Sequence, residues 1–298
     1  MDLDLAAVSS DRPVLIAGPT ASGKSALALR IAEHRGGVIV NADALQVWSC
    51  WRILTARPTP EEESRATHAL FGHLDPGADW SVGQWLRAVA PFVTAWRQGG
   101  PRPIIVGGTG LYFAALTEGL AEVPPIAAEI RHRADHLLRD GGLQGMIAAL
   151  DGPTRERIDL RNPARVQRAW EVLTGTGRGL AEWLAAGQTP LLGLDEVEAL
   201  RLEIAPAALA GRIDRRFDLM LDAGALDEVR RNLDIWDPAA PWAKAIGARE
   251  LVAHAAGMLT LEQAREQAKA ASRQYAKRQR TWQRSRMAAW KPVLVAPS

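Results

Sequence analysis

Residues Gly18 to Ser25 read GPTASGKS. It matches the phosphate-binding loop pattern GxxxxGK followed by Ser or Thr. The loop lies between a short apolar run, Val14 to Ala17, and a helical pattern from Ser25 to Glu33, as that motif requires. The sequence therefore predicts a strand that ends in a site for a phosphate or diphosphate group.

The residues of this loop have separate expected roles. Gly18 and Gly23 allow backbone conformations that turn successive N–H groups toward one anion, and Lys24 adds a point charge. The hydroxyl of Ser25 is the expected ligand of a magnesium ion, Mg2+. The predicted diphosphate-binding residues are Gly18, Pro19, Thr20, Ala21, Ser22, Gly23, Lys24 and Ser25. Kinases and ATPases share this motif, so it does not identify the reaction.

Two further strands are predicted, at Val38 to Val40 and at Pro103 to Val106. Helical patterns separate the strands, notably Trp80 to Arg97. Strands that alternate with helices indicate a parallel sheet, and such sheets bind ligands at the carboxyl ends of their strands. We therefore expect the loops that follow the three strands to meet at one edge of the sheet.

The pattern changes after Gly119, where helices are predicted without an intervening strand. A strand-like run returns at Leu200 to Ile204, and helical patterns then cover Ala207 to Leu221 and Leu261 to about Trp290. The earlier helices are predicted at Ala127 to Leu138, Gln144 to Leu150 and Pro163 to Thr174. We predict an α/β fold with a phosphate-loop NTPase-like parallel sheet core and carboxyl-terminal helices, formed by residues 1–119 and 199–298, and a helical insertion domain at residues 120–198.

The composition limits the class of protein and the compartment in which we expect it. The chain has 298 residues, 47% hydrophobic and 23% charged, which is typical of a globular protein with a sizeable core. Cys50 is the single cysteine, so a disulfide within the chain is excluded and a reducing compartment is expected. Asp2 and Asp4 stand where a secretory signal would carry basic residues, and no apolar stretch is long enough for a membrane span. We expect a cytoplasmic monomer with no membrane partner.

Polar residues follow the second and third predicted strands. Asp43 lies in the segment NADALQVW, and Thr109 lies in a Gly-Gly-Thr-Gly loop. Asp43 can serve as a base, as the cap of a helix or turn, or as a metal ligand, and Thr109 can be a turn residue or a hydroxyl contact to a ligand. Their expected position at the edge of the sheet makes both candidates for a site.

The last predicted helix carries a basic face. Arg273, Lys277, Arg280 and Arg284 are spaced so that they share one side of the helix, and residues 262–291 contain nine Lys or Arg against two Glu. A run of charges is often only a solvated helix face. Few acidic partners within the segment favour instead a surface that follows nucleic-acid phosphates.

Together these motifs resemble the tRNA dimethylallyltransferase family, also called tRNA isopentenyltransferases, in its bacterial form. The resemblance covers nearly the whole chain and rests on eight blocks in order. They are GPTASGKS at 18–25, NADALQVW at 41–48, LTARP at 54–58, VGGTGLYFAALTEGL at 106–120, RNPARVQRAWEVLTGTG at 161–177, RIDRRFDLML at 212–221, AIGARE at 245–250 and YAKRQRTWQR at 275–284.

The resemblance implies that the phosphate loop binds dimethylallyl diphosphate and that the acceptor is tRNA. The dimethylallyl group would go to the N6 amine of the adenosine immediately 3′ of the anticodon, in tRNAs reading codons that begin with U. Asp43 would be the base for that amine, Thr109 a contact to the flipped-out nucleotide, and Arg216, or its neighbour Arg215, the arginine at the diphosphate. The implied tRNA-binding residues are Ala44, Leu45, Gln46, Arg131, Arg165, Arg168, Lys244, Arg249, Lys277, Arg278, Arg280 and Arg284.

The chain departs from the family pattern at two positions, and three other functions compete with this reading. Ala44 and Trp48 stand where the family usually has Ser and Tyr, so a hydroxyl contact is lost while an aromatic surface remains. The alternatives are an ATP-dependent small-molecule phosphotransferase, a nucleotide-dependent RNA-binding switch, and an adenylate isopentenyltransferase that acts on free nucleotide. The phosphotransferase does not need a basic carboxyl-terminal helix, and the switch does not need Asp43. The helical insertion, with the motifs that resemble tRNA contacts, argues against the enzyme that acts on free nucleotide.

Overall fold

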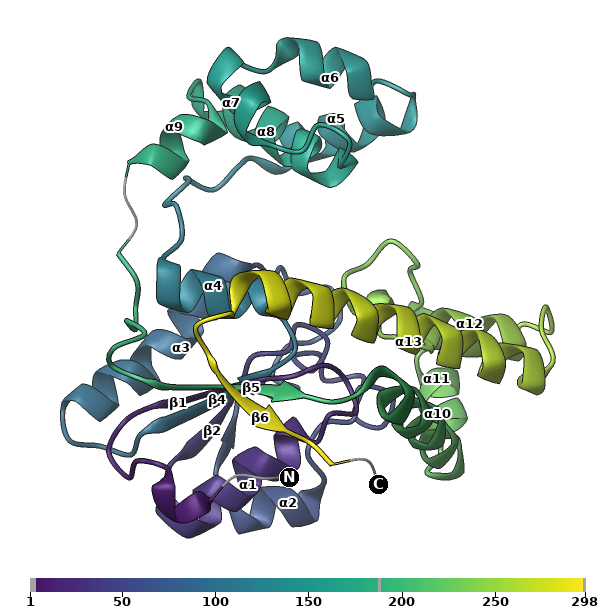
Figure 1. The fold of residues 1–298 in the computed structure, drawn as a ribbon. Coiled ribbons are helices and arrows are strands. Elements are labelled where there is room, and N and C mark those ends of the chain that lie inside the picture. Colours follow the sequence, from purple (N-terminus) through teal and green to yellow (C-terminus); the bar gives the residue numbers. More distant parts are fainter. Residues whose placement is uncertain (1–3, 187–188, 297–298) are drawn as a thin grey trace. The chain divides into compact units, whose positions relative to one another are not determined.

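The computed structural model describes residues 4–186 and 189–296, so Asp2 of the amino-terminal segment lies outside the described residues. Within them, a six-stranded sheet has the strand order β3-β2-β4-β1-β5-β6, and every neighbouring pair is parallel (Figure 1). The strands are β1 (Val14–Ala17), β2 (Val38–Asn41), β3 (His68–Ala69), β4 (Pro103–Gly107), β5 (Glu198–Glu203) and β6 (Lys291–Leu294). The parallel α/β sheet predicted from the sequence is confirmed.

Helices cover both faces of this sheet. Successive residues of β1 point to opposite sides, so Leu15 packs with α3, α4 and Trp290, while Ile16 packs with α1 and the first half of α10. These helices and their companions are α1 (Lys24–Arg35), α2 (Pro60–Arg65), α3 (Val82–Arg97), α4 (Gly110–Glu118), α10 (Pro206–Asp222), α11 (Ala225–Arg231), α12 (Ala248–Ala255) and α13 (Leu261–Arg286). Nowhere in the described residues is a helix both long and apolar enough to cross a membrane.

The register of the strands brings three loops together. Ala17 at the end of β1 pairs with Gly107 at the end of β4, and Asn41 at the end of β2 pairs with Val106. The loops after β1, β2 and β4 therefore leave the sheet at the same edge, as expected from the parallel arrangement.

Both outer strands of the sheet were missed by sequence analysis. β3 has two residues, and β6 has a single buried side chain, Val293, so neither gives a clear apolar run. α13 was expected to extend to about Trp290, but it ends at Arg286 and the chain then turns into β6. Trp290 is buried against α4 through Phe113, which explains why the turn occurs before it.

The chain forms two compact units, one of Met1–Thr117 with Leu191–Ser298 and one of Glu118–Pro190. Where the structure describes it, the second unit contains helices and no strand, and it has its own core, which includes Met146, Val166 and Trp170. Its helices are α5 (Ala128–Arg139), α6 (Leu143–Ala149), α7 (Gly152–Arg157), α8 (Pro163–Thr176) and α9 (Leu180–Ala185). The chain rejoins the sheet unit at Leu191, ahead of residue 199, because Leu192 is buried among α4 and the sheet and bonds to the Leu116 carbonyl.

Candidate active site

The loop after β1 has the backbone geometry of an anion site. Gly23 has φ 88°, the left-handed conformation that favours glycine, and it precedes Lys24, the first residue of α1. Gly18 serves a different purpose, since a Cβ there would lie 2.5 Å from the Ser22 hydroxyl oxygen. Close packing, not a positive φ, therefore requires glycine at position 18.

Two cationic side chains stand at this loop. Lys24 is only 7% exposed, and burial lowers its pKa to about 8, with Asp43 opposing the shift and Arg216 adding to it. Burial likewise lowers the pKa of Arg216, again opposed by Asp43. Arg216 lines the same cavity as Lys24, whereas Arg215 is exposed on α10. Of the two arginines left open by the sequence, Arg216 is therefore the one at the cavity.

The loop after β2 is held by Asn41. The Asn41 side chain accepts the backbone N–H of Asp43 at 2.8 Å and donates to the carbonyls of Asp43 and Leu70, both at 3.0 Å. Asp43 accepts the N–H of Leu45 through Oδ1 at 3.0 Å, so the turn role considered for this residue is real. Its Oδ2 lies on the side of Gly108, 3.2 Å from where a Cβ of that glycine would be. One oxygen therefore stabilises the turn, and the other lies toward the loop after β4.

Thr109 joins the two loops. Its hydroxyl oxygen accepts the Ala44 N–H at 2.9 Å, and its backbone N–H donates to the Ala42 carbonyl at 3.2 Å. Because the hydroxyl acts here as an acceptor, its hydrogen is left to donate to a ligand. The contact of Thr109 with a nucleotide stays a prediction.

Gln279 of α13 connects the phosphate loop with the loop after β4, and sequence analysis missed it. Its Oε1 accepts the Thr20 N–H at 2.8 Å, and its Nε2 donates to the Gly108 carbonyl at 3.1 Å. The Thr20 amide, expected to bind diphosphate, is thus already bonded to a side chain. A Cβ at Gly108 would lie 2.1 Å from Gln279 Nε2, so that glycine is needed for the contact.

The loops after β1 and β2, together with α10 and α13, line a small cavity of about 60 Å³. Its polar lining brings together Lys24, Asp43 and Arg216, which lie far apart in the sequence. Tyr275 of α13 also lines the cavity, and burial together with the nearby Asp43 raises its pKa, so its phenol is neutral. A positively charged site for an anion and a buried carboxylate thus line the same cavity. A group transfer from a phosphorylated donor requires this arrangement.

The residues expected to bind tRNA differ in their surroundings. Gln46 is buried and donates to the carbonyls of Thr55 and Ala56 at 2.9 and 2.8 Å, so it orders the loop that follows it. Ala44, Leu45 and Arg280 are half-buried. The exposed members are Arg131, Arg165, Arg168, Lys244, Arg249, Lys277, Arg278 and Arg284. Their contacts with tRNA stay predictions.

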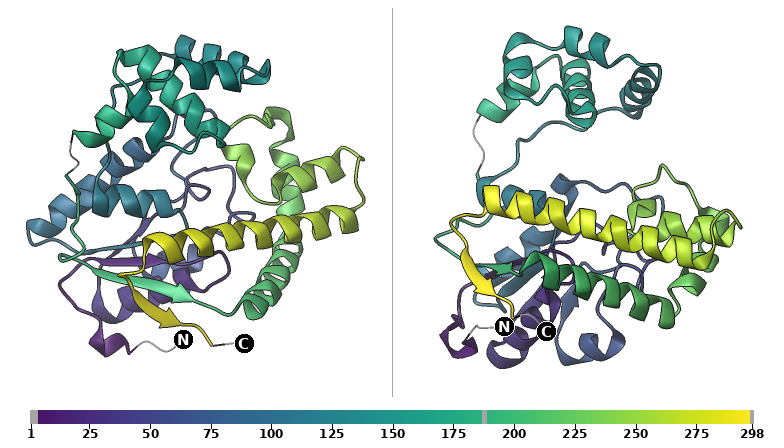
Figure 2. Two further views of the ribbon diagram at one scale, coloured as in Figure 1. Left: turned by 45° about the horizontal axis from the view of Figure 1, so that its top comes forward. Right: turned by 45° about the vertical axis from the view of Figure 1, so that its right-hand side comes forward.

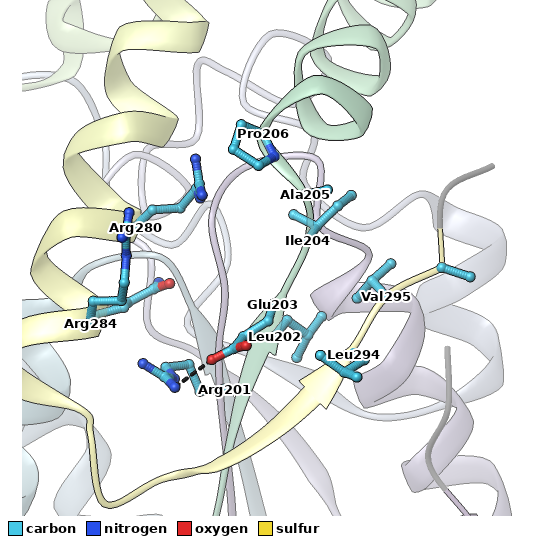
Figure 3. A pocket seen from close by; sticks show the side chains of 12 residues that line it. Arg201, Leu202, Glu203, Ile204, Ala205, Pro206, Arg280, Arg284, Leu294 and Val295 are labelled. Carbon is cyan, nitrogen blue, oxygen red and sulfur yellow. Dashed lines mark hydrogen bonds and ion pairs between the residues drawn. The ribbon is translucent and has the colours of Figure 1, made fainter.

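Arg280 and Arg284 line a second, larger cavity of about 830 Å³ in the sheet unit. They extend from α13 toward strand β5, where Arg201 pairs with Glu203 (Figure 3). The Nε of Arg201 is buried and has no hydrogen-bond partner among the described residues. This cavity is cationic but includes neither Asp43 nor the phosphate loop, so the smaller cavity is the candidate active site.

The expected basic face of α13 is partly neutralised by acidic residues of α10. Arg273 pairs with Asp214, and Lys269 and Arg265 both pair with Asp218, at 2.8 and 2.6 Å. The two helices lie side by side (Figure 2). The first half of α13 is therefore neutralised by α10, a long-range pairing that a count of charges within the segment could not reveal.

The residues at the loop could hold the expected magnesium ion only together with the phosphates of a substrate. Among residues 4–186 and 189–296, no group of three or more His, Cys, Asp or Glu could hold a metal ion. Mg2+ commonly keeps several waters and binds through one or two protein oxygens and the phosphates of its substrate. The Ser25 hydroxyl, exposed at the start of α1, suits that kind of site. The role of Ser25 stays a prediction.

Comparison with known proteins identifies relatives of this chain. The family described as IPP transferase matches residues 46–286, and the family described as isopentenyl transferase matches residues 12–71. A tRNA dimethylallyltransferase of Cereibacter sphaeroides is 59% identical over 290 residues, which are 97% of this chain and 91% of that protein. One from Dinoroseobacter shibae is 59% identical over 293 residues, 97% of each chain.

Solved structures give the same result. The tRNA isopentenylpyrophosphate transferase of Bacillus halodurans matches with a TM-score of 0.67 and 30% identity, over 95% of this chain and 90% of that one. A eukaryotic dimethylallyltransferase acting on tRNA matches in fold, with a TM-score of 0.80, 24% identity, and coverage of 95% of this chain and 73% of that one. The length and identity of these matches leave one conclusion: the chain belongs to the tRNA dimethylallyltransferase family.

Proposed function

We propose that this protein transfers a dimethylallyl group from dimethylallyl diphosphate to the N6 amine of the adenosine immediately 3′ of the anticodon, in tRNAs reading codons that begin with U. Diphosphate is the second product. The observation that carries the proposal is the joint presence of Lys24, Arg216 and Asp43 around one small cavity, in a chain of this family. Membership of the family supports tRNA as the acceptor.

The cations act on the leaving group. Lys24, Arg216 and the amides at the start of α1 stabilise the charge that collects on the diphosphate as its bond to carbon breaks. A magnesium ion bound through the phosphates and Ser25 would add positive charge at the same oxygens. Because these groups are already in place in the protein, little reorganisation is needed during the reaction.

Asp43 acts on the acceptor. The lone pair of N6 attacks carbon C1 of the dimethylallyl group, a nitrogen–carbon bond forms, and the electron pair of the C1–oxygen bond leaves with diphosphate. The proton that N6 loses passes to the Asp43 carboxylate. An adenine amine is a weak nucleophile because its lone pair is delocalised into the ring, so removal of this proton as the bond forms lowers the barrier.

The test is transfer in vitro with unmodified tRNA. The protein is incubated with tRNA, dimethylallyl diphosphate and magnesium, and the nucleosides are then analysed for N6-dimethylallyl adenosine. We expect the modified nucleoside only in tRNAs that carry adenosine at the position next to the anticodon. An otherwise identical tRNA with guanosine at this position is the matched control.

Parallel reactions separate the competing functions. ATP hydrolysis or phosphate transfer without any prenylated nucleoside would support the small-molecule phosphotransferase. Prenylation of free adenosine monophosphate in preference to tRNA would support the enzyme that acts on nucleotide. Binding of RNA with no chemistry under any condition would support the non-catalytic switch.

A further inference from the structure

Helix α13 contacts the loop after β4 at two positions one turn apart. Gln279 donates to the Gly108 carbonyl, and Trp282 lies so close to Gly110 that there is no room for a Cβ on that glycine. The two glycines stand on either side of Thr109 in the sequence. The loop expected to contact the acceptor is therefore held by α13 both before and after that residue.

Gln279 extends this link to the phosphate loop. Its Oε1 accepts the Thr20 N–H at 2.8 Å while its Nε2 donates to the Gly108 carbonyl at 3.1 Å. The Gln279 side chain is 6% exposed, so water competes little for either bond. A single side chain thus connects the loops after β1 and β4, which are expected to hold the donor and the acceptor.

Gly108 also brings the Gln279 amide close to the expected base. A Cβ at Gly108 would lie 3.2 Å from Asp43 Oδ2 and closer still to Gln279 Nε2. The carboxylate and the amide therefore flank the same glycine. A shift of this amide would change how the loop after β4 packs against Asp43.

Another side of the small cavity has a support of its own. Glu228 of α11 is 5% exposed, and its two oxygens accept the backbone N–H groups of residues 52–54 at 2.6, 3.0 and 2.8 Å. Leu54, the last of these residues, lines the cavity. Because this support comes from α11, a change at Gln279 should leave that side of the cavity in place.

Group transfer depends strongly on the separation of its two reactants. The reacting atoms must approach to about 3–3.5 Å in the direction of attack, and a displacement of about 1 Å can lower the rate about 100-fold. Here the leaving group is expected at the phosphate loop and the amine near Asp43 and Thr109. Hydrogen bonds that join these loops fix the separation before either substrate arrives.

We propose that Gln279 is a positioning residue that sets the spacing between the phosphate loop and the loop of Thr109, and thereby aligns the donor with the acceptor. The inference rests on the proposed function, since alignment matters only for a transfer between the two. Gln279 acts through the Thr20 amide and the Gly108 carbonyl and touches neither reacting group.

Two substitutions separate the two bonds. Gln279→Met keeps a side chain of similar length but forms neither bond, whereas an ionised Glu in Gln279→Glu still accepts the Thr20 N–H and cannot donate to Gly108. We expect both variants to lower kcat by roughly 10- to 100-fold. The affinities for dimethylallyl diphosphate and for tRNA should stay close to wild type, because the cations and the exposed face of α13 are unchanged.

Gln283→Met is the matched control. Gln283 is 4% exposed on the same helix, and within residues 4–186 and 189–296 its side chain bonds to neither loop. Its replacement should leave kcat unchanged. An equal loss of kcat in Gln283→Met would overturn the inference, because the effect would then be one of helix packing.

Hydrogen exchange of single amides, measured by NMR without substrates, tests the link independently of the reaction. The Thr20 amide should exchange faster in Gln279→Met than in the wild type, and at the wild-type rate in Gln279→Glu and Gln283→Met. Unchanged exchange in Gln279→Met would overturn the inference. If the wild-type protein prenylates no tRNA, the proposed function fails, and the exchange result alone decides whether Gln279 holds the two loops together.

The kinetic results are equally decisive. Transfer by Gln279→Met with the wild-type kcat would overturn the inference, and so would a loss that appears only in the affinity for dimethylallyl diphosphate. A fall in kcat with both affinities preserved would support it. Melting temperatures identify a variant that has lost its fold, and if this happens to Gln279→Met, the kcat of Gln279→Glu tests the Gly108 bond alone.

Discussion

Asp43 uses Oδ1 for the turn after β2, and this explains how a single substitution can test its chemistry. Asp43→Asn keeps an oxygen that accepts the Leu45 N–H, so the loop and the melting temperature should be preserved. The amide cannot take the proton of an amine, so we expect transfer to fall roughly 10²- to 10⁴-fold while tRNA binding survives. Single-turnover transfer, measured across a series of magnesium concentrations, gives the rate.

Two other results are possible for this variant. A rate close to wild type would mean that the turn is the only role of Asp43. Partial recovery of the rate in excess magnesium would assign the carboxylate to metal binding instead of proton transfer.

Lys24 predicts opposite pH dependences for binding and for stability. Its pKa is about 8 in the folded protein against 10.5 for an ordinary lysine, so between these values the unfolded chain holds a proton that the folded one has lost. Stability should therefore rise with pH across this window, as far as this group is concerned. Diphosphate binding needs the charged amine, so affinity should fall as pH increases through about 8.

Calorimetry checks this prediction. Near pH 8.5, binding of dimethylallyl diphosphate should take up a proton, seen as a binding enthalpy that depends on the ionisation enthalpy of the buffer. Lys24→Arg keeps the charge at all these pH values and should flatten the profile. A wild-type affinity that is constant from neutral to alkaline pH would contradict the assignment.

The residues of the site were predictable from the sequence where they belong to a local pattern. The phosphate loop and Asp43 directly follow strands, and parallel strands end at one edge, so their meeting could be inferred. Gln279 and Glu228 could not be found in this way. Gln279 bonds to Thr20, which is 259 residues away in the sequence, and Glu228 bonds to Leu54, which is 174 residues away. A contact between residues so far apart produces no pattern in the local sequence.

At the scale of single elements, α13 divides into two halves with different partners. Arg273 and the basic residues before it pair with α10, while Lys277 and Arg278 are exposed. The periodicity of the sequence placed the basic residues on a helix correctly. It could not show that α10 supplies two aspartates to the first half, because the paired residues are far apart in the sequence, 59 residues for Arg273 and Asp214.

This division predicts different effects of substitutions along α13. Lys277→Ala and Arg280→Ala should weaken tRNA binding and reduce the slope of log K against log salt by about one unit for each lost phosphate contact. Arg273→Ala is the matched control, since its charge is already paired with Asp214 and its loss should leave the slope nearly unchanged. Titration of tRNA at several salt concentrations measures the slopes.

Dimethylallyl diphosphate binding should be the same in all three variants. If Lys277→Ala and Arg280→Ala both keep the wild-type affinity and slope, the second half of α13 does not bind tRNA.

At the scale of the whole molecule, the candidate site lies within one of the two units. Every residue of the small cavity belongs to the unit with the sheet, and the helical unit of Glu118–Pro190 has a separate core. The strand–helix alternation and the all-helical stretch were readable from the sequence because they depend on local periodicity. The outermost strands were not, because β3 and β6 are defined by their neighbours in the sheet more than by their own residues.

The separation into two units predicts which backbone amides a bound donor protects from hydrogen exchange. Ligand that binds only the folded state stabilises it by about 2.7 kcal/mol at 100 times its Kd, and this stabilisation belongs to the unit that forms the site. Dimethylallyl diphosphate with magnesium should therefore slow hydrogen exchange in the phosphate loop, the Asp43 loop and α10, and should leave peptides from Glu118–Pro190 unchanged. Without magnesium the protection should be weaker, and ATP should not be hydrolysed. Equal protection of both units by the donor alone would mean that they unfold as one, and robust ATP turnover would contradict the assignment of the phosphate loop to a prenyl diphosphate.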